Sequence, residues 1–322
     1  MIGCGSIGRR HMKNLMSLGE DVVASDVMAE NRAWVKENLG VRVFEKTEGA
    51  LLEKPDAALV CTPPSTHLPL AKLALEAGCH VFVEKPLSHD LSGIKDIAKL
   101  ASRKKLIVSI GYNMRFNRSL MKVKEMVSQG TIGKPLSARL IFGQYLPTWR
   151  PWQDYRKSYT ASKSLGGGII LDGSHEVDYA RWLFGEASEI CCMAKKVSDL
   201  DVETEDVAEM NIMFKGGAIV NIHLDFIRQD YARKCEIVGE KGTISWDYSK
   251  GSVVLYDADK KATEVLDLSD DPNAMYVNEM RHFIGCIKGG KKPLVNLEEG
   301  EKSLALALKA KESAESGKTI KV

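Results

Sequence analysis

The 322-residue sequence lacks the features that mark membrane, nucleic-acid-binding or secreted proteins. No apolar run approaches the roughly 18 residues of a membrane span, and the N-terminus has no apolar signal-peptide core. Lysine and arginine total 45 against 43 aspartates and glutamates, so the net charge is only +2. Such a balance gives no electrostatic reason to expect nucleic acid or an anionic membrane as a partner. We therefore expect a cytoplasmic protein with neither partner.

The sequence also lacks a cysteine framework. The number of cysteines is seven, which is odd, and no two form a C-x-x-C pair. Cys61, Cys79 and Cys191 stand inside strand-like apolar runs, where a thiol behaves as a small hydrophobic group. This usage predicts reduced thiols and no metal site.

What is present is a change of pattern near residue 115. Before it, short apolar runs alternate with helical stretches, which is typical of a parallel sheet covered by helices on both faces. After it, long alternating runs separated by glycine turns predict a largely antiparallel sheet, with a helix near 178–184 and two closing helices. We predict an α/β chain with a Rossmann domain over residues 1–118 and an α+β domain over residues 119–322.

The first residues, MIGCGSIG, contain a G-x-G-x-x-G motif. Gly3, Gly5 and Gly8, with Ser6 and Ile7 between them, open a predicted helix whose N-terminus suits a pyrophosphate. Asp26 ends the next strand, at the place where an acidic residue binds the adenosine ribose. An aspartate repels a 2′-phosphate, and Val27 and Met28 supply no cation to bind one. The predicted cofactor is NAD, with NADP less favoured.

The strand that should precede this loop is nearly missing. Only Met1 and Ile2 stand before the first glycine, although that strand is central in a doubly wound sheet. Losing it would leave backbone groups of its neighbours unpaired. We expect a natural N-terminus longer by about five residues, enough for an average strand.

Two further segments carry candidate chemistry. Lys85 lies between Glu84 and Pro86 at the end of a predicted strand, where open α/β sheets bind ligands. Pro86 can hold a cis bond that fixes the direction of Lys85, and a lysine can stabilise a developing alkoxide. A surface lysine before a proline turn is the alternative.

The second segment is GGGIILDGSHEVDYARWLFG, residues 166–185. Asp172 or Ser174 is expected to cap a helix that begins near His175. The helix dipole favours a neutral imidazole there, as a general base for a hydroxyl proton requires. Asp172 and Asp178 lie three residues before and after His175, so either can orient the ring. A purely structural histidine is the alternative.

The segment QYLPTWRPWQDYRKSY, residues 144–159, concentrates aromatic and arginine side chains. Aromatic faces stack on sugar rings, and arginines bind carboxylates or phosphates. This favours a polyol, sugar acid or nucleotide sugar as the substrate, and an arm packed on a neighbouring subunit is an equal alternative. The candidate substrate residues are Trp149, Arg150, Trp152, Tyr155 and Arg156, with Asn113, Arg115 and His175. His11, His223 and His282 are expected to be structural.

In combination, GCGSIGRRH, CTPPSTH, EKPL, GYNMRF and the 166–185 segment resemble the glucose–fructose oxidoreductase / inositol dehydrogenase (Gfo/Idh/MocA) family over essentially the whole chain. The resemblance implies a Rossmann domain and an open-faced sheet often used for oligomerisation, hence a homodimer or homotetramer. It implies that Lys85 is the motif lysine, His175 the catalytic acid/base and Glu84 a contact to the cofactor ribose. Thr62, Pro63 and His67 would lie along the nicotinamide. Many family members place the aspartate four residues before the histidine, and here Asp172 lies three before, so its role stays open.

These observations predict an NAD-dependent oxidoreductase that transfers a hydride between a secondary hydroxyl of a sugar-like substrate and nicotinamide. One alternative is a redox-neutral glycoside hydrolase or lyase that uses NAD. Another is a non-catalytic sugar-responsive or NAD-responsive binding protein, which would be expected to lose Lys85 or His175. Both residues are present.

Overall fold

The structure is a computed structural model that describes residues 1–322 in two compact units. The first unit comprises residues 1–113 and 273–302, and the second comprises residues 114–272 and 303–322. None of the helices combines the length and the apolar character that a membrane crossing needs.

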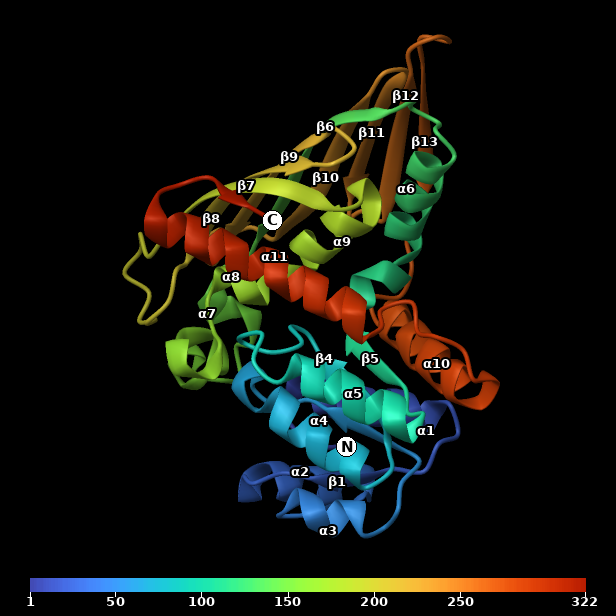
Figure 1. Cartoon of the computed structure of the whole chain (residues 1–322), viewed down its shortest axis with the longest axis vertical. Helices are drawn as coiled ribbons and strands as arrows, with labels where there is room; N and C mark the ends of the chain where they lie inside the picture. The colour runs from blue at the N-terminus through green and yellow to red at the C-terminus, as the bar shows by residue number, and fades with distance from the viewer. The chain divides into compact units, whose positions relative to one another are not determined.

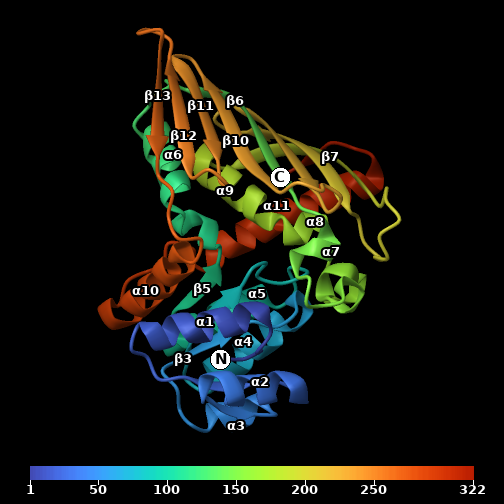
Figure 2. The same cartoon turned by 180° about the vertical axis from the view of Figure 1, so that it is seen from behind.

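The first unit is a parallel sheet with helices on both faces, as the sequence predicted. Figure 1 shows α4 and α5 in front of the sheet, and Figure 2, from behind, shows α1 on the other face. All five strands pair in parallel with their neighbours. The strands are β1 (Val23–Ser25), β2 (Arg42–Phe44), β3 (Ala57–Val60), β4 (His80–Glu84) and β5 (Val108–Gly111). The helices are α1 (Ser6–Ser17), α2 (Ala29–Leu39), α3 (Thr47–Leu51), α4 (His67–Glu76), α5 (Ile94–Lys104) and α10 (Ala274–Gly289).

The first three residues take the place of the central strand. Ile2 bridges both Ser25 of β1 and Val60 of β3 in parallel. Its N–H donates to the Leu59 carbonyl at 2.8 Å, and its carbonyl accepts from the Cys61 N–H at 2.8 Å. On the other side, Ser25 N–H donates to the Met1 carbonyl at 2.8 Å. The sheet is therefore continuous in the order β2–β1–(1–3)–β3–β4–β5. Where residues 1–3 lie, the backbone groups of β1 and β3 are paired, so the expected gap is filled there.

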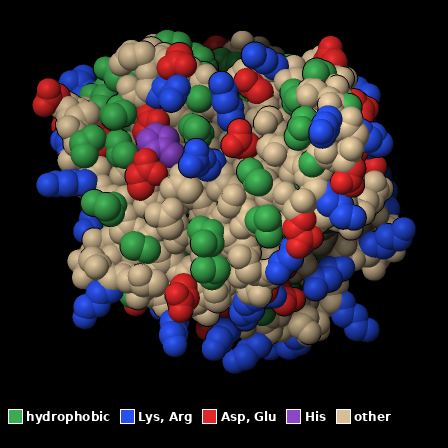
Figure 3. All heavy atoms as spheres, turned by 90° about the horizontal axis from the view of Figure 1, so that it is seen from above, with side chains coloured by type: hydrophobic (Ala, Val, Ile, Leu, Met, Phe, Trp, Pro, Cys, Tyr) green, Lys and Arg blue, Asp and Glu red, His purple; other side chains and the backbone are tan.

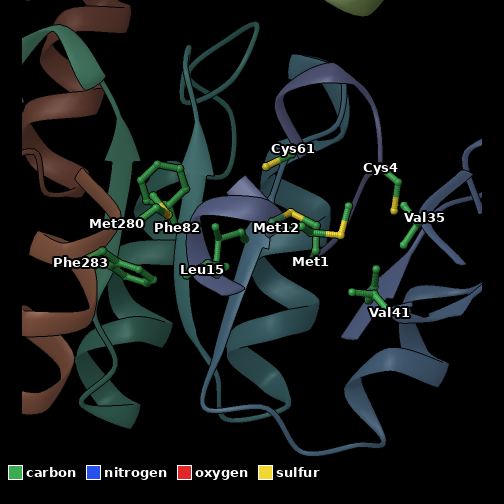
Figure 4. Packing of buried hydrophobic residues seen from close by; sticks show 12 residues of the cluster. Met1, Cys4, Met12, Leu15, Val35, Val41, Cys61, Phe82, Met280 and Phe283 are labelled. Carbon is green, nitrogen blue, oxygen red and sulfur yellow. The ribbon is translucent and has the colours of Figure 1, made fainter. Parts of the chain in front are cut away.

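The N-terminal amino group lies inside this sheet. The Met1 ammonium donates to the Val23 carbonyl at 2.7 Å, and burial lowers its pKa. The Met1 side chain belongs to the hydrophobic core with Met12 of α1 and Phe82 of β4 (Figure 4). Phe283 of α10 closes the same cluster, with its ring centroid 5.7 Å from that of Phe82. Helix α10, which follows the second unit's sheet strands in sequence, is thus part of the packing of the first unit.

The second unit is a nine-stranded sheet in the order β13-β12-β11-β10-β6-β9-β8-β7-β14. Every pair is antiparallel except β6–β9, in agreement with the predicted, largely antiparallel sheet. The strands are β6 (Pro135–Gly143), β7 (Ala187–Lys195), β8 (Val207–Phe214), β9 (Ile219–Asp225), β10 (Ala232–Gly239), β11 (Gly242–Asp247), β12 (Ser252–Asp257), β13 (Ala262–Asp267) and β14 (Ile320–Lys321). The helices are α6 (Arg118–Ser128), α7 (Leu146–Trp149), α8 (Ile169–Asp172), α9 (Ser174–Phe184) and the part of α11 (Leu297–Ser316) from residue 303 onward.

One face of this sheet is covered and the other is open. In β8 the buried residues alternate with exposed Glu209, Asn211 and Met213, as the two-residue period of a strand requires. Figure 3 looks down on the molecule, and hydrophobic, basic and acidic side chains are interspersed on the face that it shows.

The same alternation decides which cysteines are buried. Cys61 and Cys79 are buried, as predicted, whereas the prediction for Cys191 was wrong because its side chain is exposed. Its neighbour Cys192 points to the covered face instead, and burial raises the pKa of the Cys192 thiol to about 12. An apolar run cannot show which of two adjacent residues faces inward.

His223 of β9 provides a test of this face in solution. Hydrogen bonds to the Asp225 and Glu209 carboxylates, at 2.9 and 2.6 Å, raise the pKa of His223. Its stabilising contribution is therefore complete below the ordinary histidine pKa of about 6.5 and is lost as the pH rises through the raised value. In urea unfolding, His223→Gln should lower the free energy of unfolding more at pH 6 than at pH 9.

The matched control is His282→Gln. Burial lowers the pKa of His282, whose Nε2 accepts from the Leu294 N–H at 2.9 Å. Its contribution is therefore lost as the pH falls, and the difference between wild type and variant should have the opposite pH trend. Equal differences at both pH values for His223→Gln would contradict the assigned ion pairs.

Candidate active site

The glycine loop is built by close backbone contacts. Gly3 has φ +93°, and a Cβ there would lie 2.5 Å from the Cys61 carbonyl oxygen. A Cβ on Gly8 would lie only 2.1 Å from the Gly3 carbonyl oxygen, so α1 can pack onto the loop only without a side chain at this position. Gly5 is different, because nothing lies within 4 Å of its added Cβ. Two glycines thus serve packing, and Gly5 faces open space at the N-terminus of α1, where Ser6 and Ile7 begin the helix.

Asp26 lies directly after β1 and binds back to the loop. Its Oδ2 accepts from the Cys4 N–H at 2.7 Å, and its Oδ1 accepts from the Met28 N–H at 2.7 Å. Asn31 donates to the same carboxylate at 3.1 Å. The carboxylate is therefore held beside the glycine loop.

The structure adds two cations to this neighbourhood that the residues next to Asp26 in sequence do not supply. Arg32 donates to the Asp26 carbonyl at 2.9 Å, and Arg9 donates to the Asn31 side chain at 2.9 Å. The Arg9 guanidinium also lies 4.1 Å from the centre of the Trp34 ring. The sequence places Arg9 one helical turn after Gly5, and so near the glycine loop, but nothing in the sequence pairs Arg9 with Asn31.

The loops that follow β3 and β4 are tied together by one histidine. Thr62 and Pro63 follow β3, and Lys85 and Pro86 follow β4, its parallel neighbour. His67 is 1% exposed, with Nε2 2.7 Å from the Thr62 carbonyl and Nδ1 2.9 Å from the Pro86 carbonyl. Burial lowers the pKa of His67 despite these carbonyl contacts. The Lys85–Pro86 peptide bond is cis, as the sequence allowed.

Glu84 is engaged inside the unit. Its Oε1 lies 2.6 Å from Nε2 of His11, which is fully buried, and its Oε2 accepts from the Lys85 N–H at 3.1 Å. The His11 ring also packs edge-on against Phe82 and Tyr276. Glu84 therefore links α1 to the segment that carries Lys85. Asn113, 3% exposed, follows β5 at the same edge of the sheet.

In the second unit, His175 lies in the first turn of α9 and is 9% exposed. The expected cap is absent, since α9 follows Gly173 without a side-chain cap from Asp172 or Ser174. The reason is that the short helix α8 precedes it, and Asp172 is the last residue of α8 rather than a loop residue. The sequence reading of a single helix start was wrong on this point.

The two aspartates near His175 have different partners. Both oxygens of Asp178 accept from Arg115 at 2.8 Å, and Ser303 also donates to Oδ1 at 2.8 Å. Arg115 is itself 2% exposed, so the structure places it in a buried ion pair with a residue of α9. Asp172 instead accepts a hydrogen bond of 2.6 Å from the hydroxyl of Tyr159. Sequence reasoning missed this contact, because 13 residues separate the two.

The residues of the 144–159 segment fall into two groups. Trp149, Arg150 and Tyr155 line one hollow, with Leu146, Gln153, Ser158 and Thr160. Trp152 and Arg156 do not line it. Trp152 is 74% exposed, and the Arg156 guanidinium forms a fork on Asp154 with two bonds of 2.9 Å.

A glycine loop that opens a helix, an acidic residue after the next strand and polar loops at the ends of parallel strands define a dinucleotide-binding fold. The comparisons agree with this class. Residues 1–112 match the family model of an oxidoreductase family with an NAD-binding Rossmann fold, and residues 120–245 match that of the GFO/IDH/MocA C-terminal domain. The chain therefore belongs to the Gfo/Idh/MocA family of oxidoreductases, which confirms the resemblance read from its motifs.

Individual relatives extend over the full length. The chain is 33% identical to a myo-inositol 2-dehydrogenase of Thermotoga maritima, covering all of this chain and 97% of that one. It is 25% identical to a scyllo-inositol 2-dehydrogenase (NAD(+)) of Bacillus subtilis, with coverage of 100% and 95%. An oxidoreductase from Agrobacterium radiobacter, solved with NAD+, L-tartaric acid and magnesium, shares the fold with a TM-score of 0.88 at 20% identity, covering 99% of this chain and 96% of that one.

Substitutions of Gly8 and Gly5 distinguish a glycine that the fold needs from one that cofactor binding needs. Gly8→Ala drives a methyl into the Gly3 carbonyl and should cost about 2–4 kcal/mol of stability, seen as a lower melting temperature. Gly5→Ala meets no protein atom and should change stability by less than about 1 kcal/mol. It should nevertheless weaken NAD binding in calorimetry at least about tenfold, because its methyl occupies space that a pyrophosphate needs. Normal NAD affinity in Gly5→Ala would mean that the cofactor does not approach here.

Proposed function

We propose that the protein is an NAD-dependent dehydrogenase that oxidises a secondary hydroxyl of a sugar-like substrate, with cyclic polyols as the first class to test. The observation that carries this is the arrangement in the first unit, where the glycine loop, Asp26, the Thr62 loop and Lys85 all follow the ends of neighbouring parallel strands. The 33% identity to a myo-inositol 2-dehydrogenase favours the polyol class.

In this proposal, residues 1–118 bind the cofactor. Gly3, Gly5, Ser6, Ile7 and Gly8 surround the pyrophosphate at the N-terminus of α1. Asp26 binds the adenosine ribose, and Glu84 contacts the second ribose. Thr62, Pro63 and His67 lie along the nicotinamide. The open space over Gly5 supports this assignment, since a backbone without a neighbour at that point is what a bound pyrophosphate requires.

Residues on both sides of position 118 carry the chemistry. When bound, NAD supplies the nicotinamide that accepts the hydride. His175 takes the proton from the substrate hydroxyl, Lys85 stabilises the oxygen as negative charge develops, and Asp172 supports His175. The substrate contacts we assign to Asn113, Arg115, Trp149, Arg150, Trp152, Tyr155 and Arg156.

We also propose a cytoplasmic homodimer or homotetramer formed through the open face of the nine-stranded sheet. Exposed Met193, Met213 and Ile219 on neighbouring strands support a contact there. Closed symmetric assemblies are the common outcome of such self-complementary surfaces.

The direct test is NADH formation, read by absorbance, from NAD and a substrate panel. The panel contains myo-inositol, scyllo-inositol, D-apiose, levoglucosan and UDP-N-acetylglucosamine. We expect turnover with at least one cyclic polyol, and loss of at least about 100-fold in kcat for Lys85→Met with NAD affinity unchanged.

The control is Lys99→Met on α5, an exposed lysine of the same unit, which should retain wild-type kcat. Release of free sugar from a glycoside without net NADH would instead identify the redox-neutral alternative. Silence from the whole panel with intact NAD binding would favour a binding protein.

Asp26 should govern the choice between NAD and NADP. Asp26→Ser removes the charge that repels a 2′-phosphate and leaves Arg9 and Arg32 nearby. The ratio of kcat/KM for NADP to that for NAD should rise at least about tenfold. Asp21→Ser, which changes an exposed aspartate before β1, should leave the ratio unchanged. An unchanged ratio in Asp26→Ser would show that another residue selects the cofactor.

A further inference from the structure

Tyr159 holds the buried carboxylate that precedes His175. Its hydroxyl donates to Oδ1 of Asp172 at 2.6 Å, within the range of a charge-assisted O–H···O⁻ bond. Asp172 is 2% exposed, whereas Tyr159 is only half-buried. A buried carboxyl group needs such a hydrogen-bond partner, because a polar group left unsatisfied in the interior costs free energy.

The glycine turn fixes the backbone of Tyr159. A Cβ on Gly167 would lie 2.3 Å from the carbonyl oxygens of both Tyr159 and Thr160, so the two segments touch through their main chains. Gly168 N–H donates to the Thr160 carbonyl at 3.1 Å, and Gly167 N–H donates to the Ser162 carbonyl at 2.9 Å. The side chain that reaches Asp172 therefore starts from a fixed point.

A second loop, residues 203–205, holds both partners. Glu203 N–H donates to the Ala161 carbonyl at 2.9 Å, close to Tyr159. Ile169 N–H donates to the Glu205 carbonyl at 3.1 Å, and Ile170 N–H donates to the Glu205 carboxylate at 3.3 Å, at the start of α8. One loop thus sets the distance between the tyrosine segment and the short helix that ends in Asp172.

We propose that Tyr159 is a positioning residue for the acid/base pair, holding the Asp172 carboxyl group in the orientation in which it can support His175. The proposal rests on the proposed function and extends it to a residue outside the 166–185 segment. The hydroxyl keeps its proton throughout, since the proton removed from the substrate goes to His175. The distance of 2.6 Å and the two backbone ties are what distinguish Tyr159 from an ordinary surface tyrosine.

The test uses the full-length protein with Tyr159→Phe, Asp172→Asn and the double variant, and with the panel polyol that the wild type oxidises fastest. Tyr159→Phe should lower kcat at least about tenfold with KM changed less than threefold and NAD affinity unchanged. On the Asp172→Asn background the same change should lower kcat less than twofold, because both substitutions remove one interaction.

Tyr248→Phe is the matched control. It removes a hydroxyl from an aromatic cluster with Tyr231 and Trp246 in the same unit and should leave kcat unchanged. Wild-type kcat in Tyr159→Phe, or a full tenfold loss added to Asp172→Asn, would overturn the proposal.

A second readout does not depend on turnover. The imidazole ¹⁵N signals of His175, assigned with His175→Asn, should move in Tyr159→Phe and stay in place in Tyr248→Phe. Unmoved His175 signals in Tyr159→Phe would overturn the positioning role even if the wild type oxidises nothing in the panel, which would be the failure of the proposed function alone.

Discussion

Backbone pairing by the first three residues is the constraint on which the first unit depends. Met1 and Gly3 bond to β1 and Ile2 bonds to the β3 side, and the glycine loop starts directly at the end of this pairing. The path of the loop follows from it, because Gly3 is held against Cys61 and Gly8 against Gly3. Asp26, paired to the Cys4 N–H, is placed by the same residues. The hydrogen bonds of these residues therefore determine where the glycine loop lies at this edge of the sheet.

In the second unit the candidate site residues are positioned in a different way. There, the candidate residues Asp172 and His175 lie not at strand ends but on two consecutive helices, α8 and α9, separated by Gly173. Their positions are set by buried polar contacts, with Asp178 held by Arg115 and Asp172 held by Tyr159. Removing one partner of a buried ion pair leaves an uncompensated charge, so Arg115 has a structural role whatever else it contacts.

Much of the fold could be predicted from the sequence, because hydrophobic periodicity and glycine punctuation depend on near neighbours. The strand before Glu84 and the helix that contains His175 follow from such local patterns. What could not be predicted depends on contacts between distant residues. Nothing local pairs Tyr159 with Asp172, places Arg9 beside Asn31, or tells exposed Cys191 from buried Cys192. The absence of the expected cap from Ser174 has a similar origin, since the first N–H groups of α8 bond to Glu205, which is distant in sequence.

Residues 159–170 are held by two sets of backbone hydrogen bonds, one within the glycine turn and one to the 203–205 loop. This has a consequence for where the sequence can change. Residues 150–157 lie just before the anchored part, and they contain Trp152, which is 74% exposed, and Arg156, which is bound only to its neighbour Asp154. Residues 150–157 make none of the backbone hydrogen bonds that join residues 159–170 to the glycine turn and to the 203–205 loop. Under the proposed function, substitutions in residues 150–157 can change the substrate contacts while the Asp172 region keeps its geometry, so mutational libraries aimed at altered specificity belong there.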